Sequence, residues 1–126
     1  MGSALILICD QDSLLTEVLD YQLGHRGYRT AIAHDGERAL ALLGEEVPDG
    51  VIMETILPVH DGHEILRRIR ESDRLKDVPV IILSARKQDR DIVEAFELGA
   101  SDYVTKPFIL EELMARLARL LRERAG

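Results

Sequence analysis

The sequence predicts an α/β fold in which helices cover both faces of a parallel sheet. Short apolar runs recur along the chain, and a segment with apolar residues at helical spacing follows each of them. Several of these runs are continuously apolar, which is typical of strands buried on both faces of a parallel sheet. The chain has 126 residues, of which 46% are hydrophobic, and this is enough for one compact domain with its own core. We therefore expect a single domain over residues 1–126, which can equally be part of a longer chain.

Five strands are expected, each ending in a turn or a polar segment. They cover residues 4–9, 28–33, 51–53, 80–83 and 102–105. The second strand alternates between apolar and polar side chains, which predicts that it is less buried than the others. The single cysteine, Cys9, lies inside the first apolar run, so a packing role is favoured and an internal disulfide is excluded.

A helix is expected after each strand. The first begins at Asp12 or Ser13, which are favourable capping residues, and ends between residues 24 and 27; Gly99 closes the fourth. Apolar side chains at helical spacing predict the inner faces of the helices. These residues are Leu14, Leu15, Val18, Leu19 and Leu23; Ala39, Leu40, Leu42 and Leu43; Ile65, Leu66 and Ile69; Ile92, Val93, Phe96 and Leu98; and Leu110, Leu113, Leu117, Leu120 and Leu121.

Composition excludes several classes of function. The net charge of −7 argues against a nucleic-acid surface, which needs clustered cations, so we expect no direct nucleic-acid contact from this domain. No apolar run approaches the roughly 18 residues of a membrane span, and the first residues lack the pattern of a signal peptide. A cytoplasmic protein with no membrane contact is the expectation.

Polar residues follow the predicted strands at their carboxyl ends. They are Asp10 and Gln11, then Glu54, then Ser84, then Lys106. In an open α/β sheet, ligands bind outside the carboxyl ends of the strands. Carboxylates suit a hard cation such as Mg²⁺, while a hydroxyl and an ammonium can donate to phosphate oxygens. Two structural alternatives stay open: Lys106 can form a salt bridge to Glu54 or Asp10, and Ser84 can cap a helix.

These motifs resemble the receiver domain of two-component response regulators. The similarity runs from about residue 4 to residue 121, and the intervals from Glu54 to Ser84 and from Ser84 to Lys106 are similar to those of the family. Four stretches carry it, namely Asp10, residues 54–58 with Asp61-Gly62, Ser84-Ala85, and residues 102–108.

The resemblance implies a flavodoxin-like (βα)5 fold with strand order 2-1-3-4-5, and a signalling role rather than enzymatic activity. In such a phosphorelay, a histidine kinase or other signalling partner supplies a phosphoryl group to a receiver carboxylate in the presence of Mg²⁺. Ser84 and Lys106 would contact the phosphoryl group, and Tyr103 would turn inward and remodel the face of the fourth helix, fifth strand and fifth helix. Lys106-Pro107 would resemble the family's cis peptide.

Two positions depart from the family pattern. Glu54 stands at the acceptor position, where the family has Asp, and Gln11 stands where the second residue of an acidic pair is expected. The resemblance implies a metal site made by Asp10, Gln11, Glu54 and the backbone carbonyl of Ile56. A neutral amide is a weaker ligand for a hard cation, so Mg²⁺ binding should be weakened or lost.

Glu54 also carries one more methylene than Asp, which moves its carboxylate by roughly 1–1.5 Å. Such a displacement is large for in-line transfer, and it points the charge toward Ser84 and Lys106. Three hypotheses follow. In the first, the chain is an interaction module that works without phosphorylation. In the second, it is a working phospho-receiver, or one that carries an engineered Asp-to-Glu substitution as a phosphomimic. In the third, it is an unrelated protein that binds a flavin or a nucleotide. The third lacks a Gly-rich phosphate loop after the first strand.

The remaining candidates concern the output face. Asp102, Glu112 and Arg116 resemble the charged residues through which receivers attached to winged-helix domains dimerise, although Ile92 stands where a basic residue is usual. A homodimer through this face is therefore expected. His60 and His63 lack the further ligands of a metal site, so we expect both to be solvated.

Overall fold

The computed structural model describes residues 3–125, and the element order matches the prediction. The strands are β1 (Leu5–Cys9), β2 (Arg29–Ala33), β3 (Gly50–Met53), β4 (Val80–Ser84) and β5 (Asp102–Thr105). The helices are α1 (Ser13–His25), α2 (Gly36–Glu45), α3 (Gly62–Glu71), α4 (Asp89–Glu97) and α5 (Leu110–Ala125). Asp12 caps α1, as expected, by accepting from the backbone N–H groups of Leu14 and Leu15.

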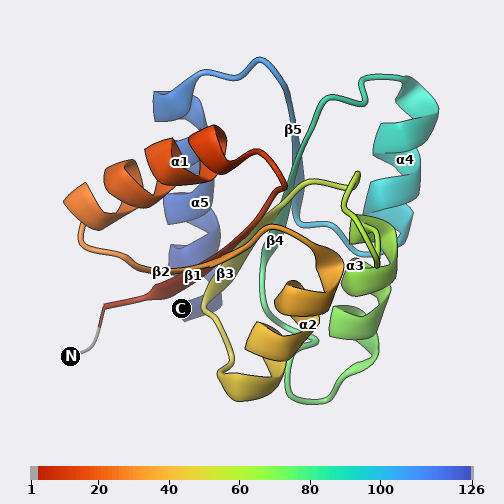
Figure 1. The fold of residues 1–126 in the computed structure, drawn as a ribbon, viewed down its shortest axis with the longest axis horizontal. Helices are drawn as coiled ribbons and strands as arrows, with labels where there is room; N and C mark the ends of the chain where they lie inside the picture. Colours follow the sequence, from red (N-terminus) through yellow and green to blue (C-terminus); the bar gives the residue numbers. More distant parts are fainter. Residues whose placement is uncertain (1–2, 126) are drawn as a thin grey trace.

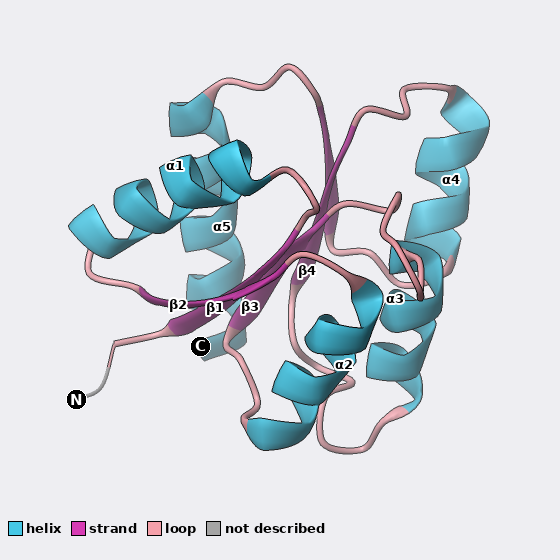
Figure 2. Ribbon diagram, viewed as in Figure 1, coloured by secondary structure: helices cyan, strands magenta, loops and turns pink. Residues whose placement is uncertain are grey.

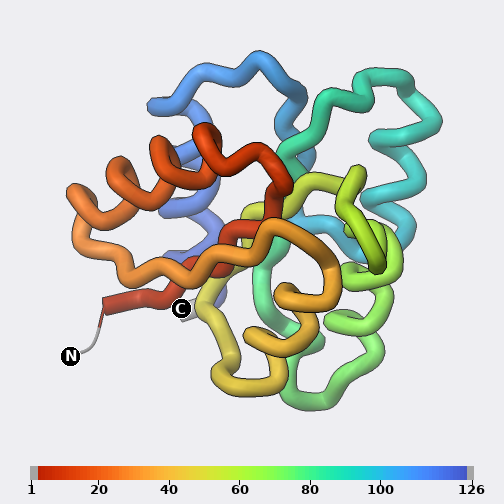
Figure 3. Tube along the Cα trace, in the orientation of Figure 1, coloured from red at the N-terminus to blue at the C-terminus, as the bar shows by residue number. Residues whose placement is uncertain are grey.

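The strands form one parallel sheet in the order β2-β1-β3-β4-β5, which confirms the flavodoxin-like arrangement. Helices α1 and α5 lie on one face of this sheet, and α2, α3 and α4 lie on the other (Figures 1 and 2). Because every strand runs in the same direction, their carboxyl ends share one edge. The loops after β1, β3, β4 and β5 run along this edge (Figure 3).

The sheet separates two apolar clusters, which explains the continuous apolar runs. In β1, Leu7 and Cys9 belong to the cluster on the α2 and α3 side, while Ile6 and Ile8 belong to the cluster on the α1 and α5 side. Successive side chains of a strand point to opposite faces, so a strand covered on both faces must be apolar throughout. Cys9 is fully buried, in agreement with its packing role. The edge strand β2 is mostly half-buried and is less buried than the other strands, as its alternation predicts.

The inner faces of two helices differ from the prediction. Val93 and Phe96 of α4 are 53% and 46% exposed, and Ala95 is the residue of that helix that is buried. In α1, Leu14 is likewise 70% exposed, whereas Thr16 is buried. Apolar spacing marks a stripe, but the part of it that packs depends on how the helix lies on the sheet.

The loop after β3 is held close to the sheet by Gly62. A side chain at this position would bring its Cβ within 2.5 Å of the Glu54 carbonyl oxygen, and the Gly62 N–H donates to the Thr55 carbonyl at 2.8 Å. The Lys106-Pro107 peptide is cis, as the resemblance implies. Within the described chain, every helix is too short or too polar to cross a bilayer.

Candidate functional site

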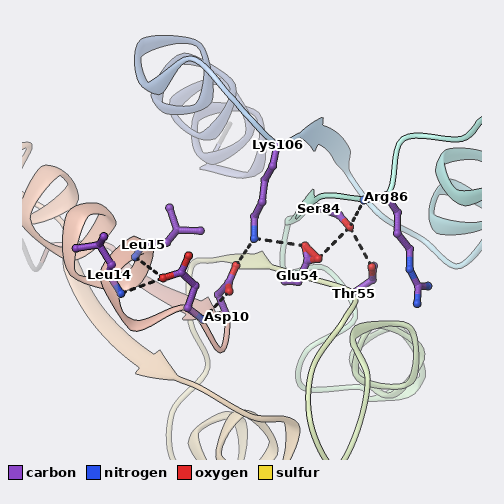
Figure 4. A network of polar contacts seen from close by, with 9 residues as sticks. Asp10, Leu14, Leu15, Glu54, Thr55, Ser84, Arg86 and Lys106 are labelled. Atoms are coloured by element: carbon purple, nitrogen blue, oxygen red, sulfur yellow. Dashed lines mark hydrogen bonds and ion pairs between the residues drawn. The ribbon is translucent and has the colours of Figure 1, made fainter.

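The strand ends bring four of the expected side chains together (Figure 4). Asp10 directly follows β1, Glu54 directly follows β3, Ser84 is the last residue of β4, and Lys106 directly follows β5. Asp10, Glu54 and Ser84 are 4%, 5% and 0% exposed, and the Lys106 side chain is 23% exposed. The site is therefore an enclosed polar cluster in which Lys106 is the most exposed of the four side chains.

Lys106 lies between the two carboxylates. Its Nζ donates to Asp10 Oδ2 at 2.7 Å and lies 3.7 Å from Glu54 Oε2. The other carboxylate oxygen of Asp10 accepts from the backbone N–H of Asp12 at 2.9 Å. Lys106 thus forms the salt bridges that the structural alternative predicts, with both Asp10 and Glu54, and Asp10 is the closer partner.

Ser84 contacts Glu54 from the neighbouring strand. Its hydroxyl donates to Glu54 Oε1 at 3.2 Å, and the Arg86 N–H donates to Ser84 Oγ at 3.1 Å. The helix-cap alternative for Ser84 is wrong, because α4 begins farther along the chain and Gln88 is its N-cap. This longer turn leaves the Ser84 hydroxyl free to face the site.

Thr55 is a member of the cluster that sequence reasoning missed. Its Oγ1 lies 3.2 Å from Ser84 Oγ, and the residue is 2% exposed. The signal that could have identified it is a hydroxyl residue directly after the acid that ends a buried strand. Arg86 was missed as well, because its contribution is a backbone N–H that carries no mark in the sequence.

Burial raises the pKa of the Glu54 carboxyl above its usual range, while Lys106 and the Ser84 hydroxyl favour the ionised form and partly offset this effect. Glu54 Oε2 is buried without a hydrogen-bond partner among the described residues. Its nearest cation is the Lys106 ammonium at 3.7 Å. Glu54 is therefore held by charge on one oxygen and by a hydroxyl on the other.

Tyr103 reaches the same turn from β5. Its hydroxyl donates to the Arg86 carbonyl oxygen at 2.8 Å, and its half-buried ring packs against the cluster on the α2 and α3 side. Burial raises the pKa of the Tyr103 phenol, and the Ser84 hydroxyl acts in the opposite direction. Tyr103 is thus connected to Ser84 through the backbone of Arg86.

The expected metal ligands are only partly gathered. Asp10 and Glu54 face Lys106, whereas Gln11 is exposed and Ile56 is 42% exposed on the following loop. Within residues 3–125, no three His, Cys, Asp or Glu side chains are grouped so that they could hold a metal ion. The oxygen donors present, two carboxylates with an amide and a backbone carbonyl nearby in sequence, are of the type that hard cations prefer.

The residues of the expected output face pair within one chain. Arg116 donates to Asp102 Oδ2 at 2.9 Å and to Glu112 Oε1 at 3.3 Å. Ile92 lies with Tyr103 and Arg116 around one depression between α4 and α5. The three charged residues Asp102, Glu112 and Arg116 therefore lie together, and Arg116 already forms ion pairs with both acids of the same chain.

His60 and His63 are not the solvated side chains that were expected. Both are half-buried: His60 Nδ1 lies 3.1 Å from Glu64, and His63 Nδ1 lies 3.2 Å from Glu94 of α4. The physical reason is the position of α3: His60 lies one helical turn before Glu64, and His63, in the first turn of α3, faces Glu94 on the neighbouring α4. Neither belongs to a metal cluster among the described residues.

Comparison with known proteins agrees with this geometry. Residues 6–118 match the family described as the response regulator receiver domain. The chain is 44% identical over 117 residues to the transcriptional regulatory protein TrcR of Mycobacterium tuberculosis, covering 93% of this chain and 45% of that protein. It is 38% identical over 120 residues to the response regulator MprA of Mycobacterium ulcerans, covering 95% of this chain and 51% of that protein. The chain thus spans about half the length of these curated relatives.

A solved receiver domain of Francisella response regulator 1452 has the same architecture. It superimposes with a TM-score of 0.90 at 30% identity, covering 96% of this chain and 98% of the other. Receiver domains are signalling modules that generally bind Mg²⁺ at the phosphorylation site. The chain belongs to the response regulator receiver domain family.

Proposed function

We propose that this receiver works without phosphorylation, as an interaction module whose signalling face is set by its unmodified site. The observation that supports this most is the environment of Glu54. Lys106 and Ser84, the two residues that the family resemblance assigns to the phosphoryl group, already contact the two oxygens of the Glu54 carboxylate. Glu54 thus occupies part of the space and charge that a phosphoryl group would take. The mimicry is partial, because a phosphoryl group brings about −2 charge and three acceptor oxygens.

The metal site supports the same proposal. Asp10 is bound to Lys106 at 2.7 Å, and Gln11 offers a neutral amide from an exposed position. A cation binding between Asp10 and Glu54 would compete with the Lys106 ammonium without a third carboxylate to favour it. If Mg²⁺ binds here, Asp10, Glu54, Gln11 and the carbonyl of Ile56 would hold it, and we propose that its affinity is low.

The output would pass through Tyr103 to the face made by α4, β5 and α5. The Tyr103 hydroxyl donates to the Arg86 carbonyl oxygen, and Tyr103 lies beside Ile92 and Arg116. We propose that this face binds a signalling protein or a second copy of the chain. Any contact with DNA would belong to another domain of a longer protein.

The alternative function is a working, Mg²⁺-dependent receiver switched by a histidine kinase, with Glu54 as a poor acceptor or as an introduced substitute for Asp. One observation favours it. Glu54 Oε2 is buried, lacks a hydrogen bond within the described chain, and lies next to the Lys106 ammonium, which is where an acceptor oxygen belongs.

Phosphorylation by a small donor separates the two functions. The protein is incubated with Mg²⁺ and acetyl phosphate, and the intact mass is measured for the parent, Glu54→Asp, and Glu54→Asp/Gln11→Asp. We expect no adduct on the parent and a phosphoryl adduct on the double variant, because the second change restores the metal carboxylate. The control Glu54→Ala/Gln11→Asp has no acceptor carboxylate and should stay unmodified. An adduct on the parent would establish the alternative function.

A further inference from the structure

The Ser84 hydroxyl has more polar neighbours than any other side chain of the site. A serine hydroxyl carries one proton to donate and two lone pairs that accept. The Arg86 N–H, which can only donate, lies 3.1 Å from Ser84 Oγ, and Glu54 Oε1 and Thr55 Oγ1 both lie 3.2 Å from it. The direction of the Ser84 proton depends on whether Ser84 or Thr55 is the donor in the contact between them.

Two arrangements are conceivable for this contact. If Ser84 donated to Thr55, an ionised Glu54 would face only lone pairs of Ser84 Oγ, and its buried carboxylate would lose a donor. If Thr55 donates to Ser84, both acceptor positions of Ser84 Oγ are filled, by Thr55 and by the Arg86 N–H. The Ser84 proton then has one acceptor left, which is Glu54 Oε1.

Thr55 is suited to this task by burial and stiffness. It is 2% exposed, and Ser84 is its one side-chain partner among residues 3–125. As a β-branched residue it has few χ1 rotamers, so its hydroxyl stays in place. Ser84 in turn accepts from the Arg86 N–H, and the Arg86 carbonyl accepts from the Tyr103 hydroxyl.

We propose that Thr55 is a positioning residue that directs the Ser84 hydroxyl to Glu54. By filling the second acceptor position of Ser84 Oγ, Thr55 fixes the Ser84 rotamer. Because Ser84 Oγ also accepts from the Arg86 N–H, this fixes the Arg86 backbone and with it the position of Tyr103. This inference rests on the proposed function, because it takes the unmodified Glu54 site as the working state.

The test compares Thr55→Val, which keeps the shape and removes the hydroxyl, with Thr55→Ser, which keeps the hydroxyl. Ser84 χ1 couplings are measured by NMR, and 3-fluorotyrosine labelling reports the Tyr103 environment, with the signal assigned by Tyr103→Phe. We expect one Ser84 rotamer in the parent and in Thr55→Ser. In Thr55→Val we expect averaged Ser84 couplings and a shifted or broadened Tyr103 signal.

Thr16→Val is the matched control, because Thr16 is equally buried but donates to the Ser13 carbonyl of α1, outside the site. It should leave both signals as in the parent. Unchanged Ser84 couplings in folded Thr55→Val would overturn the proposal, as would a Thr55→Ser variant that behaves like Thr55→Val. Should Thr55→Val fail to fold, Thr55→Ala serves in its place with the same criteria. No phosphodonor is present, so an acetyl phosphate adduct on the parent would refute the proposed function without altering this result.

Discussion

Val59 is the one non-glycine residue in residues 3–125 with a positive φ, at 71°. A β-branched side chain is strained in this region of backbone space, and Val59 is 70% exposed, so little packing compensates. We expect Val59→Gly to raise the free energy of unfolding by about 1 kcal/mol, since glycine adopts this conformation freely. Urea denaturation measures the change.

Val18→Gly provides the comparison for this prediction. Val18 is also an exposed valine, but it lies within α1, where glycine should lower the free energy of unfolding by about 0.5 kcal/mol. If both variants were destabilised alike, the backbone of Val59 would not be a source of strain.

The environment of Glu54 predicts how the stability of the protein depends on pH. Burial raises its pKa in the folded protein above the value in the unfolded chain, so the folded state binds the proton more tightly. The stabilisation from this protonated carboxyl is complete below the unfolded pKa and is lost as pH rises through the folded pKa. Glu54→Gln stays neutral throughout, so the stability difference in its favour should grow as pH rises from about 4.

Urea denaturation of the parent and Glu54→Gln at a series of pH values tests this sign, because other titrating groups cancel in the difference. Glu64→Gln is the control, since its hydrogen bond with His60 lowers the pKa of Glu64 and the dependence should run in the opposite direction. If the free energy of unfolding of Glu54→Gln minus that of the parent fell with rising pH, the raised pKa of Glu54 would be contradicted.

At the scale of elements, Arg70 joins the end of α3 to two loops. Its guanidinium donates to the carbonyl oxygens of Gly99 at 2.8 Å, Lys76 at 3.0 Å and Val78 at 2.6 Å. Arg70→Met would leave these carbonyls without their donor, and the contacts with Gly99 and Val78 are part-buried. We expect the substitution to lower the free energy of unfolding by about 2–3 kcal/mol. Thermal or urea unfolding measures this loss.

Arg67→Met is the matched control for Arg70→Met, because Arg67 is an exposed arginine of the same helix. Its effect should stay within about 0.5 kcal/mol. Equal effects of the two substitutions would show that the carbonyl contacts of Arg70 contribute little.

The elements also show where sequence reasoning stops. Strand ends could be placed because apolar runs end abruptly, and parallel strands deliver their carboxyl ends to one edge, so the meeting of Asp10, Glu54 and Lys106 follows from topology. Thr55 and the exposure of Phe96 could not be placed. Both depend on the tilt of a turn or helix against its neighbours, which is set by packing and leaves no periodic signal.

At the scale of the whole molecule, the exposed apolar residues Val93 and Phe96 lie on α4 of the face expected to dimerise. We expect the parent to form a concentration-dependent dimer through this face. Arg116→Glu should abolish the dimer, since it reverses the charge that now faces Asp102 and Glu112. Sedimentation velocity measures the association, and circular dichroism confirms that the variant is folded.

Arg67→Glu, on α3, carries the same charge change away from this face and should dimerise like the parent. A parent and an Arg116→Glu variant that are equally dimeric would exclude this face, and a monomeric parent at high concentration would exclude dimerisation of the domain itself.

The contact between Lys106 and Asp10 joins residues that are 96 positions apart in the chain. It closes only after β5 has been added to the edge of the sheet, so no nascent chain that ends before Lys106 can assemble the cluster around Glu54. A ribosome-bound fragment that ends before Lys106 therefore lacks the ammonium that joins Asp10 to Glu54, and it also lacks the α5 residues that cover one face of the sheet. The cluster thus forms only once the chain through Lys106 has been made and β5 has joined the sheet.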